Sequence, residues 1–249
     1  MSKAVVFARR NILEIVRSPI SWIFGLLMPV GIFIIMQVIV KSIGEEALAV
    51  APMFAVERFT GGIMIFGAAF LSLFAALIIS TDRKESFLSR LFASPMKSSD
   101  YIIGYALGVF PIALAQVVIT FVTALCFGLT PTVHILAALG FSVVIALLYT
   151  AIGVIFGSCL SAKNAPPLCS VVVQIAALLS GMWFDLDTIG GGFSIFCHIL
   201  PFAHAYDLIR YTLAGDYGNV WLPFLVVAAH TAALSVLAVV LFRYRAKKV

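Results

Sequence analysis

The sequence contains few charged residues and lacks the motifs of common catalytic sites. Only 11% of its 249 residues are charged, whereas 63% are hydrophobic; soluble domains carry about a quarter charged residues. Neither a GxxxxGKS nor a GxxxxGKT loop for nucleotide phosphates occurs, and HExxH and GxSxG are absent as well. The composition excludes a soluble globular protein. The missing motifs indicate that this chain is not an enzyme and does not itself hydrolyse ATP.

Cysteine pairs and charges within the apolar runs are also scarce. The four cysteines are scattered, with no CxxC pair and no histidine at metal-binding spacing, so no metal site is expected. A disulfide between Cys126 and Cys197 is an open alternative, because sequence does not fix the distance between them. His230 lies within an apolar run; we interpret it as a neutral imidazole bonded to a neighbouring helix, with a proton or ligand site as the alternative. Three amides either line a pathway or bridge helices: Gln37, Gln116 and Gln174.

Apolar runs about as long as the ~20 residues that cross a bilayer recur along the chain. They predict an all-α membrane protein with one domain over residues 1–249. Six transmembrane helices are expected, at residues 21–40, 61–80, 101–127, 135–160, 168–183 and 220–242. The fifth is the shortest of these runs.

Three segments outside the expected spans have recognisable character. Lys3–Arg17 alternates polar and apolar residues at helical spacing, which predicts an amphipathic helix along the membrane surface. Residues 82–100 are polar but contain an apolar stripe at helical spacing, with Asp82 as the N-cap of a short helix and Glu85 as its reciprocal partner. Residues 184–219 contain several acidic residues, three consecutive glycines and Pro201, so we expect interfacial or re-entrant helices there and not a full span.

The distribution of basic residues predicts the orientation. All basic residues but Lys41, Arg58 and Arg210 fall on the side that holds both chain ends. Cytoplasmic loops carry the excess of lysine and arginine, so we expect both ends in the cytoplasm and residues 41–58 outside. The net charge of +5 then follows from topology and is no indication of nucleic-acid binding.

Two stretches resemble one known family. The run DRKESFLSRLFASPMKSSDYIIGYALG from Asp82 resembles the cytoplasmic loop and following span of ABC-2 type permeases, the membrane subunits of type V ABC exporters. The runs LSGMWFDLDTI and ILPFAHAYDLIRYTLAGD, between Leu179 and Asp216, resemble that family's fifth span and outer re-entrant hairpin. Residues 1–19 are similar to its elbow helix. The acidic-Gly-Thr-Leu sequence frequent in the family's loop reads Glu85-Ser-Phe-Leu here, which puts the detailed contacts of the loop in doubt.

The resemblance implies roles for particular residues. The short helix between the second and third spans would be a coupling helix that docks on an ATPase, and its candidate contacts are Arg83, Lys84, Glu85, Phe87, Leu88, Arg90, Leu91 and Phe92. A solvated loop with an interfacial helix is the alternative. The first, second and fifth spans would face the dimer axis or translocation route, with candidate lining residues Met28, Phe33, Met36, Gln37, Phe70, Phe74, Gln174, Leu178 and Met182. Ordinary packing explains each of these as well.

The resemblance implies that this chain is the permease subunit of an ATP-driven exporter in a cell membrane, and that the cell is bacterial. Its partners would be an ABC ATPase subunit in two copies and a second permease, identical or homologous. This chain would bind no cofactor, since ATP and Mg²⁺ belong to the ATPase. A lining without charge favours an amphiphilic or lipid-like cargo, such as a drug in multidrug efflux, an antimicrobial or a glycolipid. A non-transporting scaffold or sensor, and a gradient-driven channel or carrier, are the alternatives.

Overall fold

A computed structural model describes residues 3–85 and 98–246, and within these ranges the chain is helical, without strands. Five of the described helices are long and apolar enough to cross a membrane. The first begins with the π-helical turn Ile23–Leu27 and continues through α3 (Met28–Ile43). The other four are α5 (Val56–Lys84), α7 (Ser98–Cys126), α8 (His134–Cys159) and α13 (Tyr217–Ala246). The prediction of an all-α, multi-pass chain is therefore confirmed.

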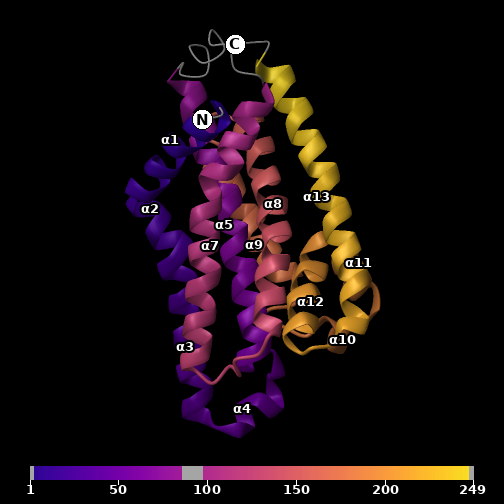
Figure 1. The fold of residues 1–249 in the computed structure, drawn as a ribbon. Coiled ribbons are helices and arrows are strands. Elements are labelled where there is room, and N and C mark those ends of the chain that lie inside the picture. The colour runs from indigo at the N-terminus through magenta and orange to yellow at the C-terminus, as the bar shows by residue number, and fades with distance from the viewer. Residues whose placement is uncertain (1–2, 86–97, 247–249) are drawn as a thin grey trace.

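The shorter elements precede or connect these helices. They are α1 (Lys3–Arg17), α2 (Pro19–Trp22), α4 (Glu45–Val50), the 3₁₀ turn Pro52–Phe54, α9 (Ala165–Leu179), α10 (Leu186–Ile189), α11 (Gly191–Ile199) and α12 (Pro201–Leu213). In Figure 1, α1 and the last turns of α13 lie at one end of the bundle, and α4 lies at the opposite end. We call these the terminal end and the far end.

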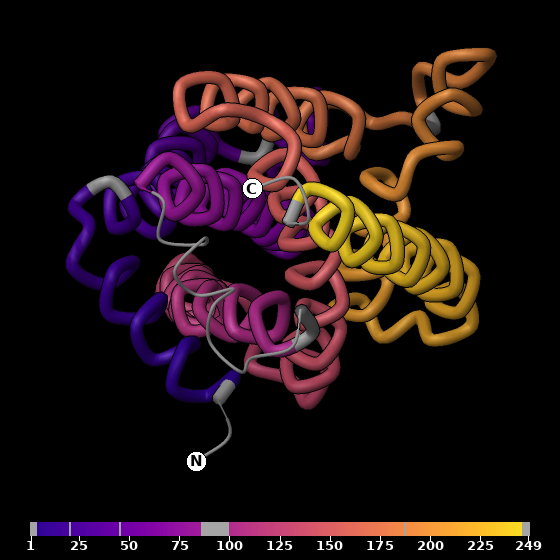
Figure 2. The backbone as a smooth tube through the Cα atoms, turned by 90° about the horizontal axis from the view of Figure 1, so that it is seen from above, coloured from indigo at the N-terminus to yellow at the C-terminus, as the bar shows by residue number. Residues whose placement is uncertain are grey.

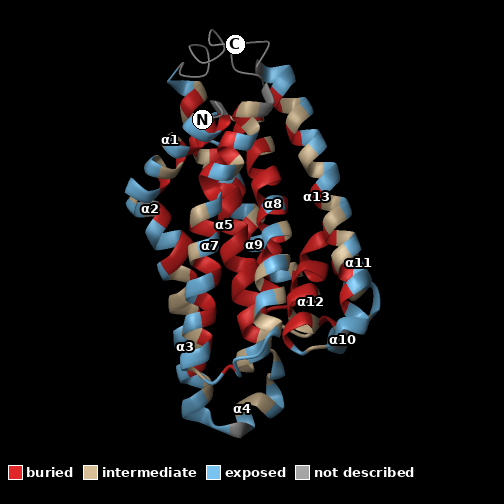
Figure 3. Cartoon of the chain, viewed as in Figure 1, coloured by how far each residue is buried: buried red, intermediate tan, exposed pale blue. Residues whose placement is uncertain are grey.

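Helix α5 forms the centre of the bundle. Along its most apolar stretch 94% of the residues are buried, against 28% for the helix ending at Ile43 and 17% for α13. Seen along the bundle axis, α5 lies between α7 and α9, with α1 to α3 on one side and α13 on the other (Figure 2). Figure 3 shows the same order, with buried residues on α5 and exposed ones on α3 and α13.

Small residues let α8 approach this central helix closely. A Cβ atom at Gly153 would lie 2.4 Å from the carbonyl oxygen of Ser72, and one at Gly157 would lie 2.9 Å from Cβ of Ile79. On the α5 side, Ala75 and Ala76 face these glycines and carry only methyl groups. Such small-residue contacts replace the hydrophobic effect as the source of helix association in a membrane, because lipid tails are as apolar as the helices.

The fifth predicted span differs from the structure. Helix α9 begins earlier than expected, with Pro166 and Pro167 in its first turn where proline is favoured, and it ends at Leu179 rather than Trp183. Its 15 residues extend only about 22 Å at 1.5 Å per residue. The chain turns away at Gly181, whose φ of +86° is a left-handed conformation that glycine adopts readily.

The segment from 184 to 219 is divided into short helices. Helices α11 and α12 together are apolar enough to count as a sixth crossing, but they meet at an angle of 89° at Leu200. Pro201 occupies the first position of α12 and Leu200 is extended, as the residue before a proline tends to be. The apolar run is therefore interrupted at Pro201 and does not form one straight helix.

Several isolated predictions are settled by local contacts. All four cysteines are free, so the Cys126–Cys197 disulfide is not formed. Nδ1 of His230 lies 2.9 Å from the carbonyl oxygen of Val226, one turn back in the same helix, and not against a neighbouring helix as expected. The amide nitrogen of Gln116 donates to the carbonyl of Ile63 at 3.4 Å, so this residue does bridge two helices.

Candidate functional site

A buried carboxylate, Asp82, lies two residues before the end of α5 at the terminal end of the bundle. It has 0% exposure and accepts hydrogen bonds from Nη1 and Nη2 of Arg10, each at 2.7 Å. The hydroxyl of Tyr105 donates to the same carboxylate at 2.8 Å. A bidentate arginine adds geometric specificity to a charge-assisted bond. We call Arg10, Asp82 and Tyr105 the clamp.

The clamp corrects the role predicted for Asp82. Because α5 continues through Lys84, Asp82 is inside a helix and not at the N-cap of the next one. Its carboxylate is bonded to residues far away in sequence, Arg10 and Tyr105. The sequence predicts only that Lys3–Arg17 is an amphipathic surface helix and gives Arg10 no partner. The available signal was an acidic residue at the end of a long apolar run, since a charge there needs a partner.

Polar contacts extend the clamp along α1. Arg10 lies 2.9 Å from Glu14, and the side-chain amide of Asn11 donates to the carbonyl of Gly104 at 3.1 Å. Burial lowers the pKa of Arg10, but its hydrogen bond and charge interaction with Asp82 outweigh burial and raise the pKa overall. Burial raises the pKa of Glu14 although Arg10 opposes this effect. The arginine is thus held in its charged form against the carboxylate.

Close packing fixes α1 against the start of α7. The ring of Phe7 contacts those of Tyr101 and Tyr105, with centroid distances of 5.8 and 4.9 Å. Two glycines on α7 make room for α1: a Cβ atom at Gly104 would lie 2.4 Å from the Phe7 ring, and one at Gly108 would lie 2.5 Å from Cβ of Asn11. Helix α1 is therefore part of the folded bundle and does not only lie along its surface.

The clamp lies on both sides of the predicted coupling segment. Asp82 belongs to the helix that precedes residues 86–97, and Tyr105 belongs to the helix that follows them. The bond between Tyr105 and Asp82 joins these two helices directly, and Arg10 joins both of them to α1 through the same carboxylate. The predicted ATPase contacts Phe87, Leu88, Arg90, Leu91 and Phe92 lie outside the described residues. Lys84 and Glu85 are exposed at the end of α5.

Arg83 has a contact that sequence reasoning missed. Its Nη1 lies within hydrogen-bond distance of three carbonyl oxygens at the end of α8, those of Gly157, Ser158 and Leu160, at 3.1, 2.6 and 3.1 Å. These carbonyls have no partner within their own helix, and a cation also suits the negative end of the helix dipole. Arg83 therefore joins the end of α5 to the end of α8.

The predicted pathway residues divide into two groups. Phe33, Gln37, Phe70, Phe74 and Met182 are buried within this chain. Phe33 stacks on Phe59 at 5.8 Å, and the amide of Gln37 donates to the carbonyl of Phe54 at 2.9 Å. Met28 and Met36 are half-buried, and Gln174 and Leu178 are exposed on α9. In this chain, the structure does not bring the nine residues together along one surface.

A second charged cluster lies where α5 begins. Nη1 of Arg58 lies 3.5 Å from Oδ2 of Asp185. Asp207 on α12 lies 3.0 Å from Arg210 and 3.4 Å from Nε2 of His198 on α11. The five side chains line a small cavity of about 20 Å³. Each acid faces a base, so this outer cluster joins α5, α11 and α12 without leaving a large excess of one charge.

Long apolar helices around a buried central helix define a multi-pass membrane protein. The sequence model of the family described as ABC-2 type transporter matches residues 3–214, most of the chain. The chain therefore belongs to the ABC-2 type transporter family, as the resemblance predicted. It is 27% identical to "ABC transporter G family member 20" of Dictyostelium discoideum over 167 residues, which are 64% of this chain and 22% of that protein. The aligned part thus covers about a fifth of that relative.

Proposed function

We propose that this chain is the permease subunit of an ATP-driven ABC exporter, with ATP hydrolysed by a separate ATPase subunit. The observation that carries the proposal is the clamp, because it fixes the helices on both sides of residues 86–97 to α1. A segment that receives force from an ATPase needs stiff attachments to the spans. Two short charged bonds to a carboxylate with 0% exposure provide one such attachment.

The proposed orientation places the terminal end in the cytoplasm. The positions of α1 and the last turns of α13 at one end of the bundle support this orientation, together with the basic residues near them (Figure 1). Helix α4 would then lie outside. An ATPase beneath the terminal end would reach residues 86–97, and α1 would serve as the elbow helix.

The proposed translocation route lies between two copies of the chain. Since α5 is buried, it is not available to line the route, and the exposed apolar faces of α3 and α9 take its place. Ile35 and Val38 on α3, and Val171 and Leu178 on α9, are each at least half exposed, at 60, 54, 52 and 51%. Gln174 adds one uncharged polar group to the α9 face. Such a lining suits an amphiphilic or lipid-like cargo.

The bent pair α11 and α12 would form a re-entrant cap over the outer end of this route. The 89° angle at Leu200 and the outer cluster support a hairpin that returns to the side on which it began. Backbone that is not continuously helical is tolerated at membrane depth only where protein or water covers it. The cap would be fastened to α5 by the contact between Arg58 and Asp185.

Reconstitution tests the proposal. The chain and a candidate ABC ATPase from the same genome are co-purified and placed in liposomes with a fluorescent phospholipid or a lipophilic dye. We expect movement of one of these probes that needs ATP and stops when the catalytic glutamate of the ATPase is replaced. Failure of the two proteins to associate would favour a scaffold or sensor. Transport driven by an ion gradient without ATP would establish a carrier instead.

A further inference from the structure

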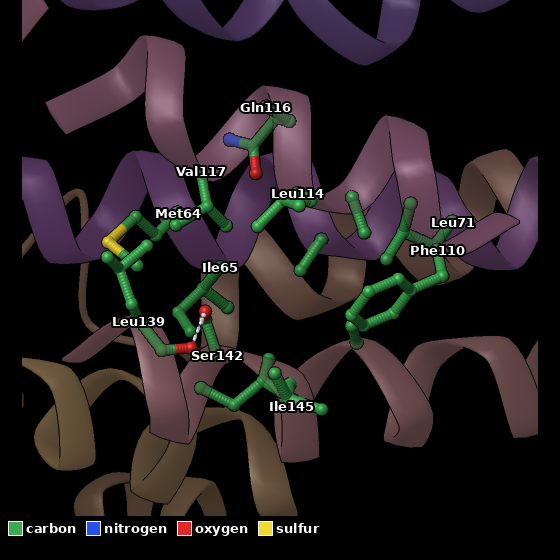
Figure 4. A pocket seen from close by; sticks show the side chains of 14 residues that line it. Met64, Ile65, Leu71, Phe110, Leu114, Gln116, Val117, Leu139, Ser142 and Ile145 are labelled. Atoms are coloured by element: carbon green, nitrogen blue, oxygen red, sulfur yellow. Dashed lines mark hydrogen bonds between the residues drawn. The ribbon is translucent and has the colours of Figure 1, made fainter. Parts of the chain in front are cut away.

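A cavity lies between the N-terminal helices and the central helix, close to the clamp. It has a volume of about 190 Å³, and an engineered cavity of about 150 Å³ is already large enough to hold benzene. By contrast, the recess between α5, α7 and α8 in Figure 4 has a volume of only about 30 Å³. The lining of the larger cavity comes from α1, α2, the turn between them and α5, and includes Glu14, Ser18, Ser21, Phe74, Leu77 and Thr81.

Three hydroxyl groups line this cavity without a hydrogen bond to any other described residue, namely those of Ser18, Ser21 and Thr81. Ser21 is only 4% exposed, and burying a hydroxyl without a partner is unfavourable. The recess in Figure 4 differs in this respect, because the hydroxyl of Ser142 there donates to the carbonyl of Leu139 at 2.7 Å. The cavity beside α1 therefore offers hydrogen-bonding groups that protein partners do not use.

The cavity also has an excess of negative charge at one side. The side chain of Glu14 is 37% exposed and lies 2.9 Å from Nη2 of Arg10. The same nitrogen donates to Asp82 at 2.7 Å, so two carboxylates share one guanidinium. Burial raises the pKa of Glu14, Arg10 opposes this effect, and Asp82 and Glu85 add to it. A positively charged ligand would therefore be attracted to Glu14.

The lining changes from polar to apolar along the direction in which a lipid lies in a membrane. Thr81 is three positions before the end of α5 at Lys84, which places it at the edge of the hydrocarbon layer. Phe74 is seven positions earlier on the same helix, or about 10 Å deeper at 1.5 Å per residue. A Cβ atom at Gly25 would lie 3.0 Å from the Phe74 ring, so the π-helical turn after α2 packs against α5 at this depth. The deep end of the cavity is thus apolar.

We propose that this cavity binds the ammonium group of an amphiphilic primary amine, with the adjoining apolar chain against Phe74 and Leu77. A primary ammonium carries a positive charge and three hydrogen-bond donors. Glu14 and the three hydroxyl oxygens are acceptors for these donors. A trimethylated amine has the same charge but no N–H group, so it would leave these acceptors unpaired. The ethanolamine headgroup of a phospholipid and a free long-chain amine share the required chemistry. Since the site belongs to α1, α2 and α5, it does not depend on the proposed route along α3 and α9.

Competition between matched amphiphiles tests this site. The purified full chain in detergent receives equal amounts of phosphatidylethanolamine and phosphatidylcholine with identical acyl chains, which differ only in three N-methyl groups. Native mass spectrometry then measures which lipid is bound first. A second pair, dodecylamine and dodecyltrimethylammonium, is compared in the same way at pH 7. We expect the N–H form to be preferred by about tenfold, which corresponds to about 1.4 kcal/mol and to roughly one hydrogen bond with a charged group. The pair that shows the preference identifies the ligand as a lipid headgroup or a free amine.

Two variants and a matched control show whether the cavity causes the preference. Thr81→Val removes one acceptor and Glu14→Gln removes the charge, and each should reduce the preference by about threefold or more. Thr123→Val on α7 should leave it unchanged, because the hydroxyl of Thr123 already donates to the carbonyl of Ile119 at 2.8 Å. Ser21→Ala removes a hydroxyl without adding volume and replaces either variant if that one does not fold. Equal binding within both pairs would overturn the proposal, and so would a preference that persists in all the cavity variants.

Discussion

Replacing Asp82 with asparagine is the most direct test of the clamp. The change keeps the shape of the side chain and removes its charge. Removing one partner of a fully buried ion pair destabilises a protein by about 3 to 5 kcal/mol. Arg10 is 36% exposed at its side chain and retains Glu14 at 2.9 Å, so its charge is not left without a partner. We therefore expect Asp82→Asn to lower the free energy of unfolding by about 2 to 3 kcal/mol, which is within the range for hydrogen bonds to charged groups.

The loss of stability can be assigned to the pair by a double-mutant cycle. Denaturant unfolding in detergent, followed by circular dichroism, is compared for Asp82→Asn, Arg10→Gln and the double variant. Residues in direct contact typically show an interaction energy of about 0.5 to 3 kcal/mol, and we expect the upper part of that range. Glu14→Gln is the matched control, because it removes the other, more exposed carboxylate near the same arginine. Its effect should stay below about 1 kcal/mol.

The clamp also predicts a separation of two activities in the assembled complex. If the clamp transmits force from residues 86–97, Asp82→Asn should reduce transport more than it reduces ATP hydrolysis by the partner. Tyr105→Phe removes one hydrogen bond, worth about 1 kcal/mol, and should give a smaller effect in the same direction. Wild-type stability in Asp82→Asn, together with an interaction energy near zero, would refute the energetic reasoning. Equal reduction of both activities would refute the role in transmission.

Three further predictions concern packing, orientation and coupling. Gly153→Leu should destabilise the bundle by more than about 2 kcal/mol, because overpacking forces α5 and α8 apart, whereas Gly140→Leu on the same helix should be tolerated since nothing lies within 4 Å of its added Cβ. Single cysteines at Glu46 and Lys248 in a cysteine-free background should react with an impermeant thiol reagent in intact cells only at Glu46; reaction at both would contradict the orientation. Leu91→Asp should leave the chain inserted but release the ATPase in co-purification, and retention with normal transport would exclude a docking role for this residue.

The sequence was sufficient to predict where most helices lie, because long apolar runs have few alternatives in a membrane protein. The positions of the long helices and the break at Pro201 follow from local chemistry. The end of α9 was expected four residues too late, at Trp183 instead of Leu179, since Met182 and Trp183 continue the apolar run past the turn at Gly181. Hydropathy alone does not distinguish a turn buried in protein from the end of a span.

The central position of α5 was not predicted, and Phe70 and Phe74 were assigned to the route instead. A helix that is apolar all round suits a lipid-facing position and a buried position equally well, so its composition did not decide between them. The informative signal was the number of small residues, among them Gly67, Ala75 and Ala76, which permit close approach on several sides. The partners of Asp82 were missed for a different reason, since contacts between residues 72 positions apart leave no local pattern.

The two charged clusters suggest how one helix could connect both faces of the membrane. Arg58 and Asp82 are 24 positions apart on α5, which corresponds to about 36 Å at 1.5 Å per residue. The hydrocarbon layer is only about 30 Å thick, so both charges reach its edges while the helix between them stays apolar. At one edge α5 is fastened to α1 by the clamp, and at the other it is fastened to the loop before α10 through Asp185. Because the intervening turns are packed tightly against α8, a displacement of the clamp would move α5 as a rigid body. Movement produced at residues 86–97 would therefore reach the outer cluster without a separate relay through the exposed helices.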